Sequence, residues 1–204
     1  MATAPKKELT SIWTPANIVT CVRICFIPIF MLFATEALSG LGMTVGAQAI
    51  AAFALYILLS LTDKVDGDLA RKRGEVTDFG KFLDPIADKL LVFSALLLLL
   101  VWGMVYIWSV FVILVREFLV SALRMVASAN GEVIAADKLG KAKTTVTMVS
   151  ICALLLARAI LIATGGANFT ILLVGQALMV AAVVLTVVSG AQYFWNARHI
   201  VFRV

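Results

Sequence analysis

Long apolar runs separated by short polar connections dominate the chain. An α-helix needs about 20 mostly apolar residues to cross a bilayer. Six runs come close to that length, and they cover residues 17–35, 46–63, 82–102, 106–127, 144–164 and 169–195. We expect the second helix to continue past Asp66. The pattern therefore predicts an all-α fold, a polytopic membrane protein with six transmembrane helices.

The composition agrees with a membrane protein of one domain. Apolar residues make up 62% of the 204 residues, whereas soluble domains contain about 45–50%. No run has the composition of a separate soluble domain, so residues 1–204 are predicted to form a single membrane domain. Residues 1–16 are expected to form a cytoplasmic or interfacial segment with a short helix on the membrane surface. The basic residues form no stripe with interleaved aromatic residues, which argues against nucleic-acid binding.

The basic residues occur in alternate connections. Lysines and arginines lie in the N-terminal tail, between the second and third runs, between the fourth and fifth runs, and in the C-terminal tail. The connections after the first, third and fifth runs contain none. By the positive-inside rule, both termini and the connection between the second and third helices face the cytoplasm. Arg158 falls on the other half, and its long side chain is expected to extend to water.

Carboxylates gather around that second connection. Six of the seven aspartates of the chain lie between residues 63 and 88. Residues three or four apart share one face of a helix, and carboxylates brought close together need cations to stay ionised. Hard oxygen ligands favour Mg²⁺, Mn²⁺ or Ca²⁺. On the second helix, this spacing brings two carboxylates next to two very small residues, namely Asp63, Asp66, Gly67 and Ala70. On the third helix it brings Asp84 and Asp88 together.

The order D-x-x-D-G-x-x-A-R-x8-G-x-x-x-D-x-x-x-D resembles the signature of the CDP-alcohol phosphatidyltransferases. All fixed positions of that signature are filled, by Asp63, Asp66, Gly67, Ala70, Arg71, Gly80, Asp84 and Asp88. The resemblance implies a helical membrane enzyme with a cytoplasmic site. It implies that a phosphatidyl group passes from CDP-diacylglycerol to an alcohol and that CMP leaves. A charged loop without chemistry would leave the spacing unexplained.

The resemblance also implies roles for single residues. Asp63, Asp66 and Asp84 would hold Mg²⁺, or Mn²⁺ in its place. Asp88 would touch a second metal ion and act as the base for the acceptor hydroxyl. The positions implied to bind CDP-diacylglycerol are Asp63, Asp66, Gly67, Ala70, Arg71, Thr77 and Gly80. A homodimer surrounded by membrane lipids and a place in the bacterial cytoplasmic membrane are further implications.

Basic residues outside the signature indicate the acceptor. Charged residues in an apolar span normally have a partner of opposite charge, and Glu117 is a local candidate for Arg116. The predicted pocket for an acceptor phosphate consists of Arg116, Arg124, Lys141 and Lys143. The stretches R-E-F-L-V-S-A-L-R, L-G-K-A-K-T and N-x-x-T-x-x-R resemble the bacterial branch of the family that uses glycerol 3-phosphate. That branch makes phosphatidylglycerophosphate. Another phosphorylated acceptor, such as inositol phosphate, stays open.

Two hypotheses of other classes remain. A cation transporter would use the aspartates as a pathway, but transporter sites usually lie near the bilayer midplane. The last two apolar runs carry no acidic residue there. A membrane scaffold without chemistry leaves the aspartate spacing unexplained. Metal-dependent release of CMP separates the enzyme from both.

Overall fold

The computed structural model describes residues 14–73, 78–129 and 138–201, and these ranges are helical apart from short connections. The helices are α1 (Pro15–Ala34), α2 (Val45–Arg73), α3 (Asp78–Val101), α4 (Ile107–Ala129), α5 (Lys138–Thr164) and α6 (Phe169–Val201), with a 3₁₀ turn, η1, at Ser39–Leu41. The all-α prediction is confirmed for this part of the chain, as is the continuation of α2 past Asp66. The short surface helix predicted within residues 1–16 falls mainly outside the described residues.

Two helices begin earlier than the apolar pattern predicted. α3 begins at Asp78 and α5 at Lys138, ahead of the apolar runs that start at 82 and 144. The backbone hydrogen bonds of a helix do not depend on apolar side chains, so a helix can begin with a polar turn that precedes the apolar run. α1 begins where expected because Pro15 occupies its first turn and the Thr14 hydroxyl accepts a hydrogen bond from the Asn17 N–H at 3.3 Å.

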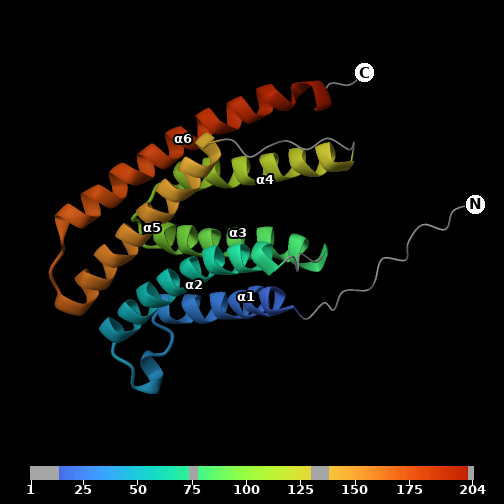
Figure 1. Cartoon of the computed structure of the whole chain (residues 1–204). Coiled ribbons are helices and arrows are strands. Elements are labelled where there is room, and N and C mark those ends of the chain that lie inside the picture. The colour runs from blue at the N-terminus through green and yellow to red at the C-terminus, as the bar shows by residue number, and fades with distance from the viewer. Residues whose placement is uncertain (1–13, 74–77, 130–137, 202–204) are drawn as a thin grey trace, which may run out of the picture.

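The helices run back and forth between two ends of a bundle. The connections after α1, α3 and α5 lie at one end, on the left of Figure 1. The start of α1 and the end of α6 lie towards the other end, which is also where α2 ends and α3 begins (Figure 1). An even number of helices thus returns the chain to the end at which it started.

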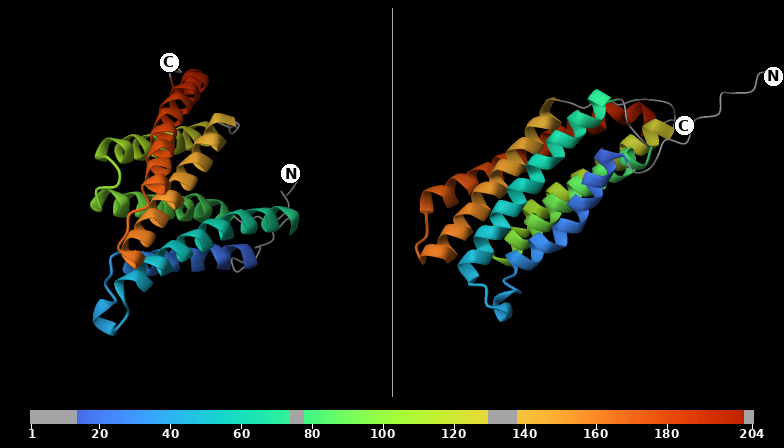
Figure 2. Two further views of the ribbon diagram at one scale, coloured as in Figure 1. Left: turned by 90° about the vertical axis from the view of Figure 1, so that its left-hand side faces the viewer. Right: turned by 60° about the horizontal axis from the view of Figure 1, so that its bottom comes forward.

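Packing divides the bundle into two groups of helices joined by α5. α1 packs against α2 and α3, α4 packs against α6, and α5 packs against both α2 and α6. Figure 2 shows α5 and α6 side by side along much of their length. Gly175 permits this closeness, because a Cβ atom there would lie 2.8 Å from Leu154 Cδ2. The Ser150 hydroxyl also donates a hydrogen bond to the Gly175 carbonyl at 2.7 Å.

Four helices are long and apolar enough to cross a membrane. They contain the stretches Asn17–Ala34, Val45–Thr62, Lys138–Thr164 and Phe169–Arg198. α3 and α4 carry more charge, including Asp88 and Lys89 in α3 and Arg116 and Glu117 in α4. Large apolar side chains are exposed on several helices, as expected where lipid replaces water as the surrounding solvent. The protein is therefore embedded in a membrane through at least these four helices.

Arg158 has protein partners at the end of the bundle opposite the N-terminus. Its Nη2 atom lies 2.8 Å from Glu36 Oε1, and its guanidinium carbon lies 3.8 Å from the centre of the Trp102 ring. The side chain is 21% exposed. Arg158 is thus partly exposed, as predicted, and it also forms an ion pair and a cation–π contact. These contacts connect α5 to the turns after α1 and α3.

Candidate active site

A cavity of about 30 Å³ lies between α3, α4 and α5. Its volume suffices for about two water molecules. Six of the nine lining residues have charged or hydroxyl side chains, and the other three are apolar. The lining residues are Asp88, Lys89, Val92 and Phe93 of α3, Ile113 and Glu117 of α4, and Lys143, Thr144 and Thr147 of α5. The cavity therefore brings the last aspartate of the signature next to a lysine of the predicted phosphate pocket.

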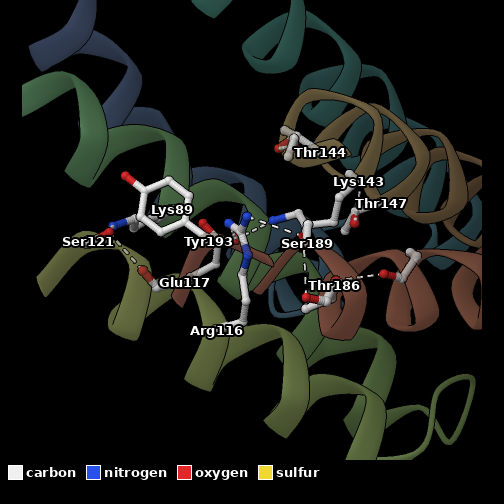
Figure 3. Close-up of polar contacts among 12 residues, drawn as sticks. Lys89, Arg116, Glu117, Ser121, Lys143, Thr144, Thr147, Thr186, Ser189 and Tyr193 are labelled. Atoms are coloured by element: carbon white, nitrogen blue, oxygen red, sulfur yellow. Dashed lines mark hydrogen bonds and ion pairs between the residues drawn. The ribbon is translucent and has the colours of Figure 1, made fainter. Parts of the chain in front are cut away.

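Glu117 joins two of the predicted basic residues. Its Oε1 atom accepts a hydrogen bond from Arg116 Nη1 at 3.1 Å and also contacts Lys143 Nζ (Figure 3). Lys143 is only 4% exposed, and a buried ammonium group needs an opposite charge beside it. Glu117 is thus the anionic partner expected for Arg116, and it serves Lys143 as well.

Lys89 is a basic residue of the cavity that the sequence analysis missed. Its Nζ atom donates to the Ser121 hydroxyl, which in turn donates to the Glu117 carbonyl at 2.7 Å. Lys89 directly follows Asp88 and precedes a long apolar run. A lysine at the start of a long apolar run is unusual, and this position could have indicated that Lys89 belongs to the site.

α6 also contributes side chains that no motif indicated. The Ser189 hydroxyl lies 3.3 Å from Arg116 Nη2 (Figure 3). The Tyr193 hydroxyl accepts a hydrogen bond from Arg124 Nε at 3.0 Å. The Arg124 guanidinium carbon is 5.5 Å from the centre of the Tyr193 ring. Ser189 and Tyr193 are polar side chains four residues apart on α6, and this shared-face spacing is the pattern that could have revealed them.

The four predicted phosphate-binding residues are not all in one place. Arg116 and Lys143 meet at Glu117. Arg124 lies further along α4, where it contacts Tyr193 of α6. Lys141 is exposed on α5. Among the described contacts, Arg116 and Lys143 are thus brought together at Glu117, and Arg124 and Lys141 are not.

Most signature side chains lie outside the described residues. Thr77 is in an undescribed segment, and of the positions within α2 and α3 only the helical backbone is described for Asp63, Asp66, Gly67, Ala70, Arg71 and Asp84. Gly80 is buried in α3, and Asp88 lines the cavity. Among the described side chains, no group of three or more His, Cys, Asp or Glu residues could hold a metal ion. The predicted metal site therefore stays a prediction. Its ligands would be carboxylates from α2 and α3, two helices that contact each other. Carboxylate oxygens are the ligands that hard divalent ions prefer.

The N-x-x-T-x-x-R stretch forms a buried polar face on α1. Asn17, Thr20 and Arg23 are each at most 4% exposed. α1 packs against α2 and α3, the two helices that carry the aspartates. Polar side chains are rarely buried in an apolar helix without a structural or functional reason.

Glu117→Gln is expected to destabilise the protein. The change leaves the Lys143 ammonium group buried without a carboxylate, at a cost of about 2 kcal/mol. The melting temperature of the purified protein in detergent should fall by about 5 °C. The double variant Glu117→Gln/Lys143→Met should recover part of that loss, because the buried Lys143 charge is then removed and only Arg116 still lacks its carboxylate.

Glu36→Gln is the matched control, since it removes a carboxylate from an ion pair that is more exposed. Its expected cost is below about 1 kcal/mol. Equal melting temperatures for Glu117→Gln and Glu36→Gln would contradict the importance of the buried pair.

Comparisons with known proteins show the family of the chain. Residues 13–188 match the family model for CDP-alcohol phosphatidyltransferases. The chain is 42% identical over 193 residues to a Bacillus subtilis protein named CDP-diacylglycerol–glycerol-3-phosphate 3-phosphatidyltransferase, covering 89% of this chain and 95% of the relative. Proteins of the same name from Rickettsia bellii and Shigella flexneri are 38% and 34% identical, over 87% and 89% of this chain and 92% and 93% of theirs. The chain belongs to the CDP-alcohol phosphatidyltransferase family.

Proposed function

We propose that the protein transfers a phosphatidyl group from CDP-diacylglycerol to glycerol 3-phosphate and so forms phosphatidylglycerophosphate and CMP. The names of the relatives support this reaction. The observation that carries it is the cavity lined by both Asp88 and Lys143. Arg116 and Lys143 form a buried basic cluster beside the Asp88 carboxylate. This arrangement suits an acceptor that has a hydroxyl group to be deprotonated and a phosphate to be bound.

The reaction is a displacement at phosphorus. A hydroxyl oxygen of the acceptor forms a bond to the phosphorus atom that carries the diacylglycerol. The bond between that phosphorus and the bridging oxygen of the diphosphate breaks, and CMP leaves with the bridging oxygen. Asp88 accepts the proton of the acceptor hydroxyl. Such transfers depend mainly on positioning and on the neutralisation of charge.

The signature residues are proposed to hold the donor. Asp63, Asp66 and Asp84, with Asp88 at a second ion, would bind two Mg²⁺ ions, with Mn²⁺ as a substitute. When bound, these ions neutralise the diphosphate and polarise the phosphoryl oxygens. The residues proposed to contact CDP-diacylglycerol are Asp63, Asp66, Gly67, Ala70, Arg71, Thr77 and Gly80.

The basic cluster is proposed to hold the phosphate of the acceptor. Arg116 can offer guanidinium N–H groups beyond those bonded to Glu117 and Ser189. Lys143 adds a buried positive charge, and Arg124 and Lys141 extend the positive surface. An acceptor without a phosphate would leave these charges without a ligand.

All six helices are proposed to cross the membrane as one domain, residues 1–204. The charges of α3 and α4 would then lie within the protein or near its cytoplasmic end. The site and both termini would face the cytoplasm, in the cytoplasmic membrane of a bacterium. A homodimer, implied by the family resemblance, is testable by light scattering of the purified protein.

Thiol labelling tests the orientation. In a background with the native cysteines replaced by alanine (Cys21, Cys25 and Cys152), Gly166→Cys should react with a membrane-impermeant reagent in spheroplasts. Lys138→Cys, at the start of α5 and so at the opposite end of that helix, should react only after the membrane is opened. Labelling of Lys138→Cys in intact spheroplasts would contradict a cytoplasmic site.

Release of CMP tests the function. The purified protein is incubated with CDP-diacylglycerol, Mg²⁺ and one acceptor per tube: glycerol 3-phosphate, inositol phosphate, serine or phosphatidylglycerol. The proposal predicts release with glycerol 3-phosphate that a chelator abolishes. Release with inositol phosphate instead would keep the mechanism and change the acceptor. No release from folded protein would favour the transporter or scaffold hypothesis.

A further inference from the structure

One short stretch of α6 contacts both arginines of α4. Ser189 binds Arg116, and Tyr193 binds Arg124, at 3.3 and 3.0 Å. Both α6 side chains are buried, with 1% and 3% of their surface exposed. They lie four residues apart and so share one face of the helix.

The two contacts on α6 are more closely spaced along the chain than the two arginines on α4. Arg116 and Arg124 are eight residues apart, and their Cα atoms are therefore about 12 Å apart along α4. Their anchors on α6 are four residues apart, which corresponds to about 6 Å along that helix. Both arginines are thus held by residues within about one turn of α6.

Gly190 adds a third contact, to the aliphatic part of Arg116. A Cβ atom at position 190 would lie 3.1 Å from Arg116 Cγ, so the α6 backbone lies directly against this side chain. Gly140 of α5 stands on another side, where a Cβ atom would lie 3.4 Å from Arg116 Nη2. The Arg116 side chain is only 13% exposed. Its position is therefore fixed by α6, α5 and Glu117 together.

We infer that Ser189, Gly190 and Tyr193 of α6 are positioning residues for the acceptor phosphate, acting through Arg116 and Arg124. An arginine that is already held in place loses less conformational freedom when its ligand binds. A planar guanidinium group also binds phosphate well only when its orientation is right. The inference rests on the proposed function, because it assigns these residues to the acceptor and not to CDP-diacylglycerol.

Two substitutions test the inference. Ser189→Ala removes the hydroxyl beside Arg116 and should raise the KM for glycerol 3-phosphate about tenfold. Gly190→Ala inserts a methyl group against Arg116 Cγ and should raise the same KM about fivefold. The kcat and the KM for CDP-diacylglycerol should stay within about twofold of the wild type. Alanine favours a helix more than glycine does, so Gly190→Ala should not lower the melting temperature by loss of helix stability.

Thr186→Val is the matched control. Thr186 is buried one turn earlier on α6, and its hydroxyl donates only to the Ala182 carbonyl among the described residues. This variant should keep the KM for glycerol 3-phosphate. A double variant adds a readout that a purely structural role would not change: in an Arg116→Ala background, Ser189→Ala should raise the KM no further.

The inference is overturned if folded Ser189→Ala and Gly190→Ala keep the KM of the Thr186→Val control. It is also overturned if Ser189→Ala raises the KM equally with and without Arg116. The wild-type protein reports separately on the proposed function. If it uses inositol phosphate, the same variants are measured with that acceptor, and a raised KM would support the positioning role while the proposed acceptor fails. An acceptor without phosphate would overturn both.

Discussion

Asp66→Asn is expected to lower the rate of CMP release by about a thousandfold or more. The substitution keeps the size of the side chain and removes the charge that would compensate a divalent ion. Binding of Mn²⁺, measured by electron paramagnetic resonance of the free ion, should weaken in parallel. Asp63→Asn and Asp84→Asn should behave alike, because the signature assigns all three aspartates to the same ions.

Asp68→Asn provides the matched control for this prediction. Asp68 lies in the same charged segment, two residues after Asp66, but at a variable position of the signature. It should keep the rate of CMP release within about threefold of the wild type. Equal losses in Asp66→Asn and Asp68→Asn would show that general charge matters, and would contradict a metal site built at the signature spacing.

Arg116→Ala is expected to raise the KM for glycerol 3-phosphate about a hundredfold. The pair that is lost is the one between Arg116 and the phosphate of the acceptor. Removing one partner of such a buried, hydrogen-bonded charge pair costs about 2–5 kcal/mol of binding free energy, and about 2.7 kcal/mol corresponds to a factor of a hundred in KM. The KM for CDP-diacylglycerol should change little, because the proposed donor residues lie on α2 and at the start of α3. Initial rates over a matrix of both substrate concentrations separate the two constants.

Arg116→Lys distinguishes geometry from charge. A lysine keeps the positive charge but cannot form the two parallel hydrogen bonds of a guanidinium group. Its KM for glycerol 3-phosphate should fall between those of the wild type and Arg116→Ala. A folded Arg116→Ala variant with an unchanged KM for the acceptor would remove Arg116 from the phosphate pocket.

The sequence was sufficient to predict the helices and the family. Apolar runs as long as a bilayer is thick leave few alternatives to helices, because lipid offers no partners for backbone groups. The signature of aspartates at fixed spacing identified the family before any relative was compared. Helix ends were less predictable, because α3 and α5 begin in polar segments whose helical state depends on neighbouring helices and not on their own apolarity.

The arrangement around the basic cluster was only partly predictable. Glu117 follows Arg116 directly, so the sequence suggested that pair. It did not show that Lys143, from a different helix, shares the same carboxylate. The roles of Lys89 and Ser189 depend on which helices are neighbours, and local spacing carries no such information. Tertiary contacts of α4 with α3 and with α6 supply it.

The claim that the basic cluster binds the phosphate of the acceptor is tested most directly by comparing glycerol 3-phosphate with glycerol. The measurement is the ratio of kcat/KM for the two acceptors, in the wild type and in Arg116→Ala. A site built to bind the phosphate should favour glycerol 3-phosphate by about 10⁴-fold in the wild type. The ratio should fall at least about tenfold in the variant. A wild-type ratio near one, or the same ratio in both proteins, would contradict the claim.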